Sequence, residues 1–425
     1  MKKKVHIIGG GTINYIRSHL ALAAPAYGQT ARRLKDLCES HSDKLEVALH
    51  LTRMAGGEKT LESTHDIADL LKALMADADT KIVFMNAAIC DFYGSIGPTH
   101  GKTEPRLSTR STLRPILELR PCEKLIGQIR KNRKDIFLVG FKQTFNATPE
   151  EQYLAGLNLV KEASCNLVLA NDTGTRLNMV ITPEEAKYHV TTERDVALKG
   201  LVEMAYLRSH LTFTRSTVVS GESIGWDANI VPTSLKAVVD YCIKEGAYKP
   251  FRGSTVGHFA FKVNDTTFVT SKRKTNFNDL DETGLVMVKT DGPDSVIAYG
   301  SKPSVGGISQ RIVFNDHKDC DCIVHAHVPI RPGSKVPVVS QREYECGSHE
   351  CGANTSRGLA KFGNLWAVYL DNHGPNVVFN RNIDPKEVID FIEANFDLNE
   401  KTGGPVSLGQ ILNTPDTLDS LMEIV

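Results

Sequence analysis

The sequence predicts an α/β protein in two parts, a doubly wound parallel sheet in the first half and a mostly antiparallel sheet in the second. Strand and helix patterns alternate along the first half, which is typical of a parallel sheet with helices on both faces. The second half has short strands separated by turns. The length of 425 residues also exceeds one core, since a domain averages roughly 150 residues.

Apolar runs and helical periodicity locate the elements of the first half. The predicted order is 5–12 (strand), 30–41 (helix), 44–52 (strand), 66–77 (helix), 80–89 (strand), 124–132 (helix), 136–141 (strand), 155–163 (helix) and 166–172 (strand). From Tyr206 to Pro232 this pattern weakens, and Ser, Thr and Gly become frequent. We therefore expect a domain boundary in that segment.

The second half opens with a helix that starts near Thr233 and that Gly246 is suited to end. Strands are predicted at 257–263, 266–271, 284–290, 321–328, 365–372 and 376–380, and further helices at 307–317 and 385–396. This order favours an α/β domain built on a mostly antiparallel sheet.

Composition narrows the class of protein. Hydrophobic residues make up 41% and charged residues 24%, and the formal net charge is zero, so no whole-chain attraction to nucleic acid or membrane is implied. Nine cysteines form no disulfide framework, which favours a reducing compartment. No apolar run approaches the roughly 20 residues of a membrane span. We expect a cytoplasmic protein.

A histidine pattern in the second half indicates a metal site. His325 and His327 are two apart on a predicted strand, so they share one face while Ala326 points away. A third histidine, His373, ends a later strand before a Gly-Pro turn. Catalytic zinc usually has three protein ligands and an open position. The alternative is that His325 and His327 are two polar residues on an ordinary strand. The pair without His373 would not distinguish this from a metal site.

The stretch VHAHVP at 324–329, followed by NHGP at 372–375, resembles the class II aldolase/adducin family. The resemblance covers about residues 231–396. It implies a divalent metal, usually zinc, held by the three histidines and acting as a Lewis acid on a carbonyl or enediolate oxygen of a small, often phosphorylated, sugar. It also implies a homo-oligomer, with a tetramer favoured.

Two departures from this family bear on its chemistry. Gly257 and His258 stand where the family usually begins Gly-Asn-x-Ser, which helps to bind phosphate. The basic residues 272–274 either supply that charge or form a solvated turn. Gly306 stands where the family keeps a glutamate, and glycine transfers no proton.

The stretch REYECGSHECG contains side chains that could replace the missing acid. We predict Tyr344, Glu345 and His349 as the catalytic candidates. Cys346, His349 and Cys351 are read either as a second metal cluster or as a locally packed loop. Cys320 and Cys322, just before the histidine pair, are read as packing residues.

The first half resembles the phosphopantothenoylcysteine synthetase family of coenzyme A biosynthesis over about residues 3–208. The resemblance rests on a glycine run after the first strand and on four later stretches, at 86–94, 101–105, 137–145 and 165–182. It implies a Rossmann-like domain that binds CTP or ATP with Mg²⁺. The implied nucleotide-binding residues are Gly10, Gly11, Thr12, Ala88, Asp91, Lys102, Phe141, Lys161 and Asn171.

Losses in this half argue against ligation. Ala21 stands where the family keeps the asparagine that handles the acyl intermediate, and residues 23–25 replace its Ser-Ser-Gly. Cys165 stands where the family keeps a second lysine. The fold is therefore expected to survive while amide formation is lost, and the open alternative is a scaffold that no longer binds nucleotide.

The sequence thus predicts a two-domain metabolic enzyme with a small-molecule substrate and no nucleic-acid or membrane partner. The expected parts are a nucleotide-binding domain at 1–208, a linker at 209–230, a metal-dependent lyase or aldolase domain at 231–396 and a tail at 397–425. The alternative is a non-catalytic binding or scaffold protein with degenerate versions of both domains.

Overall fold

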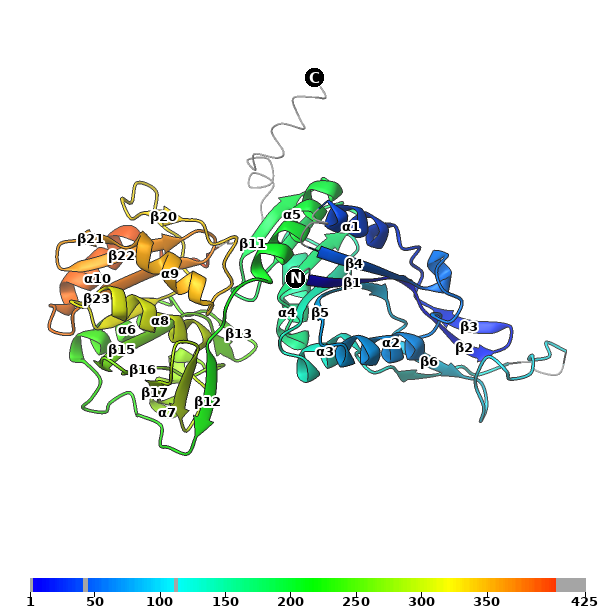
Figure 1. Cartoon of the computed structure of the whole chain (residues 1–425), viewed down its shortest axis with the longest axis horizontal. Coiled ribbons are helices and arrows are strands. Elements are labelled where there is room, and N and C mark those ends of the chain that lie inside the picture. The colour runs from blue at the N-terminus through cyan, green and yellow to red at the C-terminus, as the bar shows by residue number, and fades with distance from the viewer. Residues whose placement is uncertain (1–2, 41–44, 111–113, 403–425) are drawn as a thin grey trace, which may run out of the picture. The chain divides into compact units, whose positions relative to one another are not determined.

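The computed structural model describes residues 3–40, 45–110 and 114–402. These residues form two compact units (Figure 1). Unit 1 comprises the described residues up to Pro183 together with Tyr188–Ser209. Unit 2 comprises 184–187 and the described residues from His210 onward. Most of the predicted tail, 403–425, lies outside the described residues.

A seven-stranded sheet forms the centre of unit 1, in the order β11-β10-β9-β8-β5-β1-β4. Its strands are β1 (Lys3–Gly11), β4 (Leu45–Leu51), β5 (Thr80–Ala88), β8 (Phe137–Thr144), β9 (Leu167–Asp172), β10 (Asn178–Ile181) and β11 (Lys187–Thr191). The pairs from β4 to β9 are parallel, and β10 joins antiparallel. The predicted parallel sheet is confirmed.

Helices cover both faces of this sheet (Figure 1). They are α1 (Gln29–Glu39), α2 (Thr64–Ala76), α3 (Ile126–Asn132), α4 (Pro149–Ala163) and α5 (Arg194–Arg208), with a short 3₁₀ turn η1 (Arg53–Ala55). Two hairpins were not predicted: β2 (Ile13–Arg17) with β3 (Leu20–Ala23), and β6 (Phe92–Ser95) with β7 (Glu118–Pro121).

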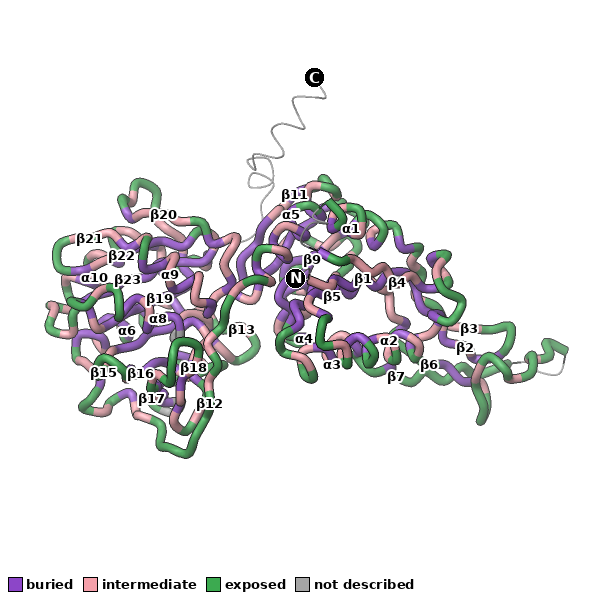
Figure 2. Tube along the Cα trace, in the orientation of Figure 1, coloured by how far each residue is buried: buried purple, intermediate pink, exposed green. Residues whose placement is uncertain are grey.

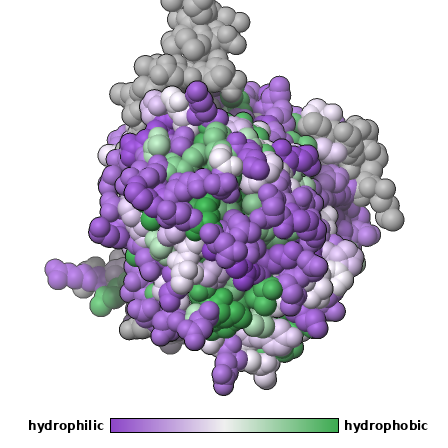
Figure 3. All heavy atoms as spheres, turned by 90° about the vertical axis from the view of Figure 1, so that its left-hand side faces the viewer, coloured by the Kyte–Doolittle hydropathy of each residue, from purple (hydrophilic) through white to green (hydrophobic). Residues whose placement is uncertain are grey.

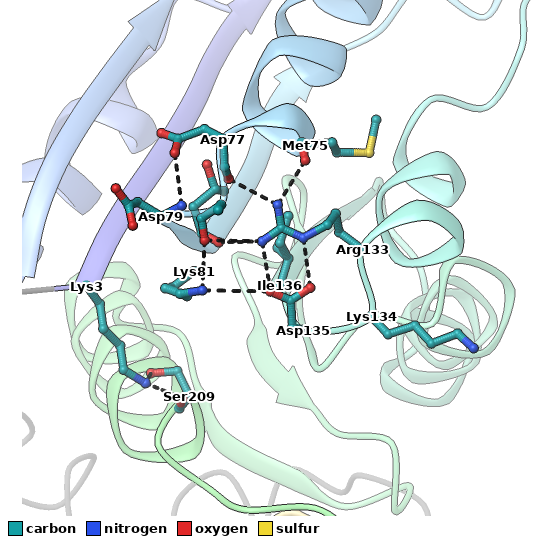
Figure 4. A network of polar contacts seen from close by, with 12 residues as sticks. Lys3, Met75, Asp77, Asp79, Lys81, Arg133, Lys134, Asp135, Ile136 and Ser209 are labelled. Carbon is teal, nitrogen blue, oxygen red and sulfur yellow. Dashed lines mark hydrogen bonds and ion pairs between the residues drawn. The ribbon is translucent and has the colours of Figure 1, made fainter. Parts of the chain in front are cut away.

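Arg133 bonds to several groups at the edge of the unit 1 sheet where its parallel strands begin (Figure 4). Arg133 donates to the carbonyl oxygens of Met75 at 2.8 Å and Asp77 at 3.0 Å, and pairs with Asp135 at 2.8 Å. The bond to Arg133 lowers the pKa of Asp135 to about 2. Since ligands of parallel sheets bind at the opposite, carboxyl edge, we assign this network to stability.

Unit 2 contains a ten-stranded sheet in the order β12-β18-β17-β16-β15-β19-β23-β22-β20, with β21 also paired to β22. The strands are β12 (Arg215–Val219), β15 (His258–Asn264), β16 (Thr267–Ser271), β17 (Leu285–Thr290), β18 (Ser295–Tyr299), β19 (Cys322–His325), β20 (Val338–Val339), β21 (Ala360–Phe362), β22 (Leu365–Leu370) and β23 (Gly374–Phe379). Only the pairs β12–β18 and β20–β22 are parallel among those described. The mostly antiparallel prediction is confirmed.

The faces of this sheet follow the two-residue alternation of its strands. Phe259 and Phe261 pack with α6 (Thr233–Lys244) and α10 (Pro385–Asn395), while Ala260 packs on the side of α8 (Val305–Asp316). The remaining elements are β13 (Pro250–Phe251), β14 (Ser254–Thr255), η2 (Phe277–Asp279), α7 (Leu280–Thr283) and α9 (His349–Gly358). Figure 2 shows the central strands buried.

Two segments of unit 2 differ from expectation. The predicted linker 209–230 contains β12, which pairs with β18 and so belongs to the sheet. The stretch with Cys346, His349 and Cys351, for which the alternatives are a metal cluster and a packed loop, runs into α9, which Ser348 caps by accepting from the amide of Cys351 at 3.0 Å. The outer face shown in Figure 3 is mostly hydrophilic, with small hydrophobic patches separated by polar residues.

Candidate metal centre

Three histidines of unit 2 converge on one point. His325 ends β19, His327 follows two residues later outside the strand, and His373 lies in the turn between β22 and β23. One ring nitrogen of each lies within 4.8 Å of the others, and the residues are only 1%, 7% and 1% exposed. The structure brings together the three predicted metal ligands, and ligation itself stays a prediction.

A backbone contact orients His325. Its Nδ1 donates to the carbonyl oxygen of Pro375 at 2.7 Å. Because a carbonyl only accepts, Nδ1 carries the proton and Nε2 carries the lone pair. That Nε2 lies 3.3 Å from Nε2 of His373. Metal-binding imidazoles are commonly fixed in this way through their other ring nitrogen.

A glycine allows the turn with His373 to approach the other two histidines. Gly374 has a φ of 150°, and a Cβ atom on it would lie 2.1 Å from the carbonyl oxygen of Ala326. The turn is closed by a bond from the amide of His373 to the carbonyl of Leu370 at 3.0 Å. A larger residue at 374 would therefore hold the two segments apart.

The spacing of the rings fits a divalent metal such as zinc. Two nitrogens bound to one tetrahedral zinc at about 2.0–2.1 Å lie roughly 3.3–3.4 Å apart, close to the observed 3.3 Å. Burial, and then the neighbouring His373, hold the pKa of His325 well below its usual value, which favours the neutral, metal-binding form. A cavity of about 10 Å³ bordered by His325 and His373 has room for one ion or water.

The predicted catalytic residues Tyr344, Glu345 and His349 do not border this cavity. His349 begins α9, where its Nε2 lies 2.7 Å from the hydroxyl of Thr214 and its Nδ1 lies 3.5 Å from Asp294. Their role in catalysis stays a prediction.

Two cysteines of the same stretch do border the cavity, Cys346 and Cys351. They do not form the second cluster considered with His349, because the three histidines are the only such ligand group among the described residues. Cys320 and Cys322 are buried, and burial raises the pKa of Cys320 to about 12. They are packing residues, as predicted.

One residue of the site was missed in the sequence. His258 lies beside His325, with ring centroids 4.7 Å apart, and borders the same cavity. A Cβ atom on Gly306 would lie 2.4 Å from Cδ2 of His258 and 3.2 Å from Sγ of Cys346. The space expected to hold an acid is therefore filled by an imidazole and a thiol. The signal in the sequence was His258 itself, because it stands where the resemblance implies an asparagine and its imidazole is a group suited to an active site.

In unit 1 the glycine run has internal partners. Gly10, Gly11 and Thr12 are buried. The amide of Gly11 donates to the carbonyl of Ala26 at 2.8 Å, and that of Thr12 donates to the carbonyl of Ala88 at 3.0 Å. Both amide donors are thus occupied within the chain. Phosphate binding at the run stays a prediction.

Two other predicted nucleotide residues are engaged in ion pairs. Asp91 is paired with Lys124 and is mostly exposed. Lys102 is paired with Glu62, whose side chain is only 8% exposed. Among the described contacts, neither the Asp91 nor the Lys102 side chain bonds to the glycine run.

The remaining predicted residues lie on or beside the sheet. Ala88 ends β5, Phe141 lies on β8 and Asn171 on β9, all half-buried. Lys161 on α4 donates to the carbonyl oxygen of Pro183 at 3.0 Å. The first three come from neighbouring strands near the carboxyl edge, where a nucleotide is expected in a doubly wound sheet.

A larger pocket of about 450 Å³ lies elsewhere in unit 1, within the size range of small-molecule sites. Its wall includes Tyr15, Lys59, Glu62 and Lys102. The Glu62 carboxylate meets the Tyr15 hydroxyl at 3.0 Å and Arg53 at 2.8 Å. Lys102 is the one predicted nucleotide residue that borders it.

Sequence comparison finds two relatives that match about two fifths of the chain. The chain is 22% identical over 172 residues to the coenzyme A biosynthesis bifunctional protein CoaBC of Thermococcus kodakarensis, covering 40% of this chain and 41% of that protein. It is 25% identical over 173 residues to CoaBC of Methanocaldococcus jannaschii, covering 40% of each. The chain thus spans about two fifths of these relatives. No family model matches.

Solved structures with partial likeness each cover slightly less than half of the chain. The DNA/pantothenate metabolism flavoprotein from Streptococcus pneumoniae is 17% identical at a TM-score of 0.40, covering 48% of this chain and 99% of that one. An L-fuculose 1-phosphate aldolase is 18% identical at 0.30, covering 46% and 99%. The predicted resemblances to the synthetase family and to the class II aldolase family are both confirmed. Scores this low do not establish a shared site or activity.

No helix among the described residues is long and apolar enough to cross a membrane.

Proposed function

We propose that unit 2 holds a divalent metal, with zinc as the expected ion, and that the chain is a two-domain metabolic enzyme of lyase, aldolase or epimerase type. The proposed substrate is a small carbonyl compound or sugar, with phosphorylated and nucleotide-linked forms included. The observation that supports this most is the 3.3 Å separation of Nε2 of His325 and Nε2 of His373 between buried rings.

The chain's own residues would hold the ion and keep its ligands in place. His325, His327 and His373 would bind it, and the carbonyl of Pro375 would keep Nε2 of His325 turned toward it. When bound, the metal supplies Lewis-acid polarisation of a substrate oxygen. Three protein ligands leave a position open for that oxygen. The names of the aldolase neighbours agree with this reaction class.

The purified protein is expected to carry close to one zinc per chain, because the three neutral imidazoles are already placed for it. Elemental analysis after dialysis against zinc and then against metal-free buffer measures this. The matched control is the same protein with both His325 and His327 replaced by alanine. A wild-type chain that retains no more metal than this control contradicts the proposal.

We further propose that unit 1 keeps the synthetase-like fold without amide-forming ligation. Ala21 offers no polar group where the family keeps asparagine. The neighbouring segment closes on the glycine run, since a Cβ atom on Gly11 would lie 2.0 Å from the carbonyl oxygen of Ala24. Nucleotide binding would first have to open this contact.

Mg²⁺ with CTP or ATP is therefore expected to raise the melting temperature by less than about 1 °C, since a ligand stabilises only in proportion to its binding of the folded state. A thermal-shift titration measures it, with Mg²⁺ alone as control. A saturable rise of several degrees would show that the chain binds the nucleotide and would contradict this expectation.

A non-catalytic binding or scaffold protein is the second candidate, and the cavity of about 10 Å³ favours it because it holds an ion but no sugar. In the enzyme, the substrate would meet the metal at its open position, and a homo-oligomer, with a tetramer favoured, would complete the site. The spectrum of a cobalt-loaded protein separates the two candidates. Added small anions change it only if the metal has an exchangeable position.

A further inference from the structure

His258 belongs to a row of side chains that crosses three strands. It is paired with His325 across β15 and β19, and His325 is paired with Asn376 across β19 and β23. Directly opposite residues of antiparallel strands point to the same face, so all three face the cavity that they border. His258 is 6% exposed, which leaves it room to act only within that cavity.

Gly306 makes the position of His258 possible. A Cβ atom there would lie 2.4 Å from Cδ2 and 2.9 Å from Nε2 of the ring, closer than packed atoms approach. The imidazole therefore depends on the absence of a side chain at 306. Two sequence departures that looked like separate losses are complementary in space.

Buried neighbours determine which ring nitrogen of His258 carries the proton. The side-chain amide of Gln310 donates to Nδ1, and its oxygen lies 3.4 Å from the hydroxyl of Thr270, which also donates to the carbonyl oxygen of Phe259 at 3.1 Å. Gln310 and Thr270 are 1% and 0% exposed, so water does not replace these contacts. With Nδ1 accepting, a neutral ring carries its proton on Nε2, which lies 2.9 Å from a Cβ atom built on Gly306.

We propose that His258 presents its Nε2–H as a hydrogen-bond donor to a small anionic oxygen ligand bound at the three-histidine metal site. The inference rests on the metal centre proposed above and specifies its ligand. A donor at this position favours carboxylate, enolate or hydroxamate oxygens over a neutral oxygen, because a hydrogen bond to an anionic acceptor is roughly twice as strong. The group that replaces the missing acid therefore stabilises negative charge in place of taking up a proton.

The test uses the full-length protein loaded with Co²⁺ and titrated with acetohydroxamate, a small anionic oxygen donor, while the visible spectrum of the metal is followed. His258→Phe removes the donor and keeps a ring, and the dissociation constant for acetohydroxamate is expected to rise roughly 10- to 100-fold. His258→Gln restores an N–H donor and is expected to recover most of the affinity. His317→Gln, at a histidine that contacts Ser356 outside the cavity, is the control.

A separate measurement keeps the inference testable if His258→Phe fails to fold. Gly306→Ala keeps the histidine at position 258 but displaces its ring by the added Cβ atom. It should therefore weaken acetohydroxamate binding to a similar extent. Long-range ¹H–¹⁵N spectra of the wild type should show His258 protonated on Nε2.

The outcomes separate this inference from the metal proposal. A wild-type chain that binds no cobalt overturns both. Cobalt binding with equal acetohydroxamate affinity in wild type, His258→Phe and Gly306→Ala overturns the inference alone. A proton found on Nδ1 overturns it as well.

Discussion

Replacement of His325 by alanine is expected to weaken zinc binding on the order of 100- to 1,000-fold, since structural zinc sites derive their affinity from a few strong ligand bonds. His325 supplies one of three nitrogens, and it is the one that a described bond to Pro375 turns toward the site. Competition with a chromophoric zinc chelator measures the change.

His317→Ala is the control for this substitution. His317 lies in the same unit and contacts the carbonyl of Ser356. It is expected to leave zinc affinity within a few-fold of the wild type. If His325→Ala and His317→Ala bind zinc equally well, the metal lies elsewhere or the cluster is structural. Circular dichroism of both variants shows whether unit 2 remains folded.

Replacement of Gly374 by alanine is expected to lower the free energy of unfolding of unit 2 by about 3 kcal/mol and to weaken zinc binding as well. The added Cβ would lie 2.1 Å from the carbonyl oxygen of Ala326 and 3.2 Å from Cα of His327. Both contacts are to backbone, which cannot rotate away. Relief requires the His373 turn to move from the other two histidines. Urea unfolding followed by tryptophan fluorescence measures the stability.

Gly333→Ala provides a matched control. Gly333 also has a positive φ, of 85°, but nothing lies within 4 Å of a Cβ atom built on it. Its substitution therefore measures backbone strain alone, expected at about 1 kcal/mol, without loss of zinc. Equal destabilisation by the two alanines would show that the close approach at Gly374 is unimportant.

The regular parts of the fold were predictable because their signals are local. Strands buried on both faces are continuous apolar runs, and β1, β5, β8 and β9 are recognisable without knowledge of their partners. The hairpin β2–β3 was not predicted, because it buries Arg17, whose partners Thr99 and Glu104 are distant in sequence.

Helix α9 was missed for a different reason. Its residues include Gly, Ser, Thr and Asn, which have low helix propensity. The helix is held by the Ser348 cap and by packing against α8, and no sequence window shows the packing.

The three histidines of the candidate site were predictable and His258 was not. His325 and His327 were expected to share a face because they are two apart on a predicted strand, and Ile323 and Val324 do pack on opposite sides of the sheet, although β19 itself ends at His325. The relation of His258 to Gly306 joins a strand to a helix. Volume complementarity of that kind appears only when the chain is folded.

The enclosure of the histidine cluster has consequences for how fast metal is exchanged. His325 and His373 are each 1% exposed and border a cavity of about 10 Å³, so within the described part of the chain these two ligands have almost no contact with solvent. Loading and release of the ion are then both expected to be slow, because each requires the His373 turn to open. A chelator should strip the native protein slowly, at a rate independent of chelator concentration, and should strip it rapidly once urea has loosened β23 from β19.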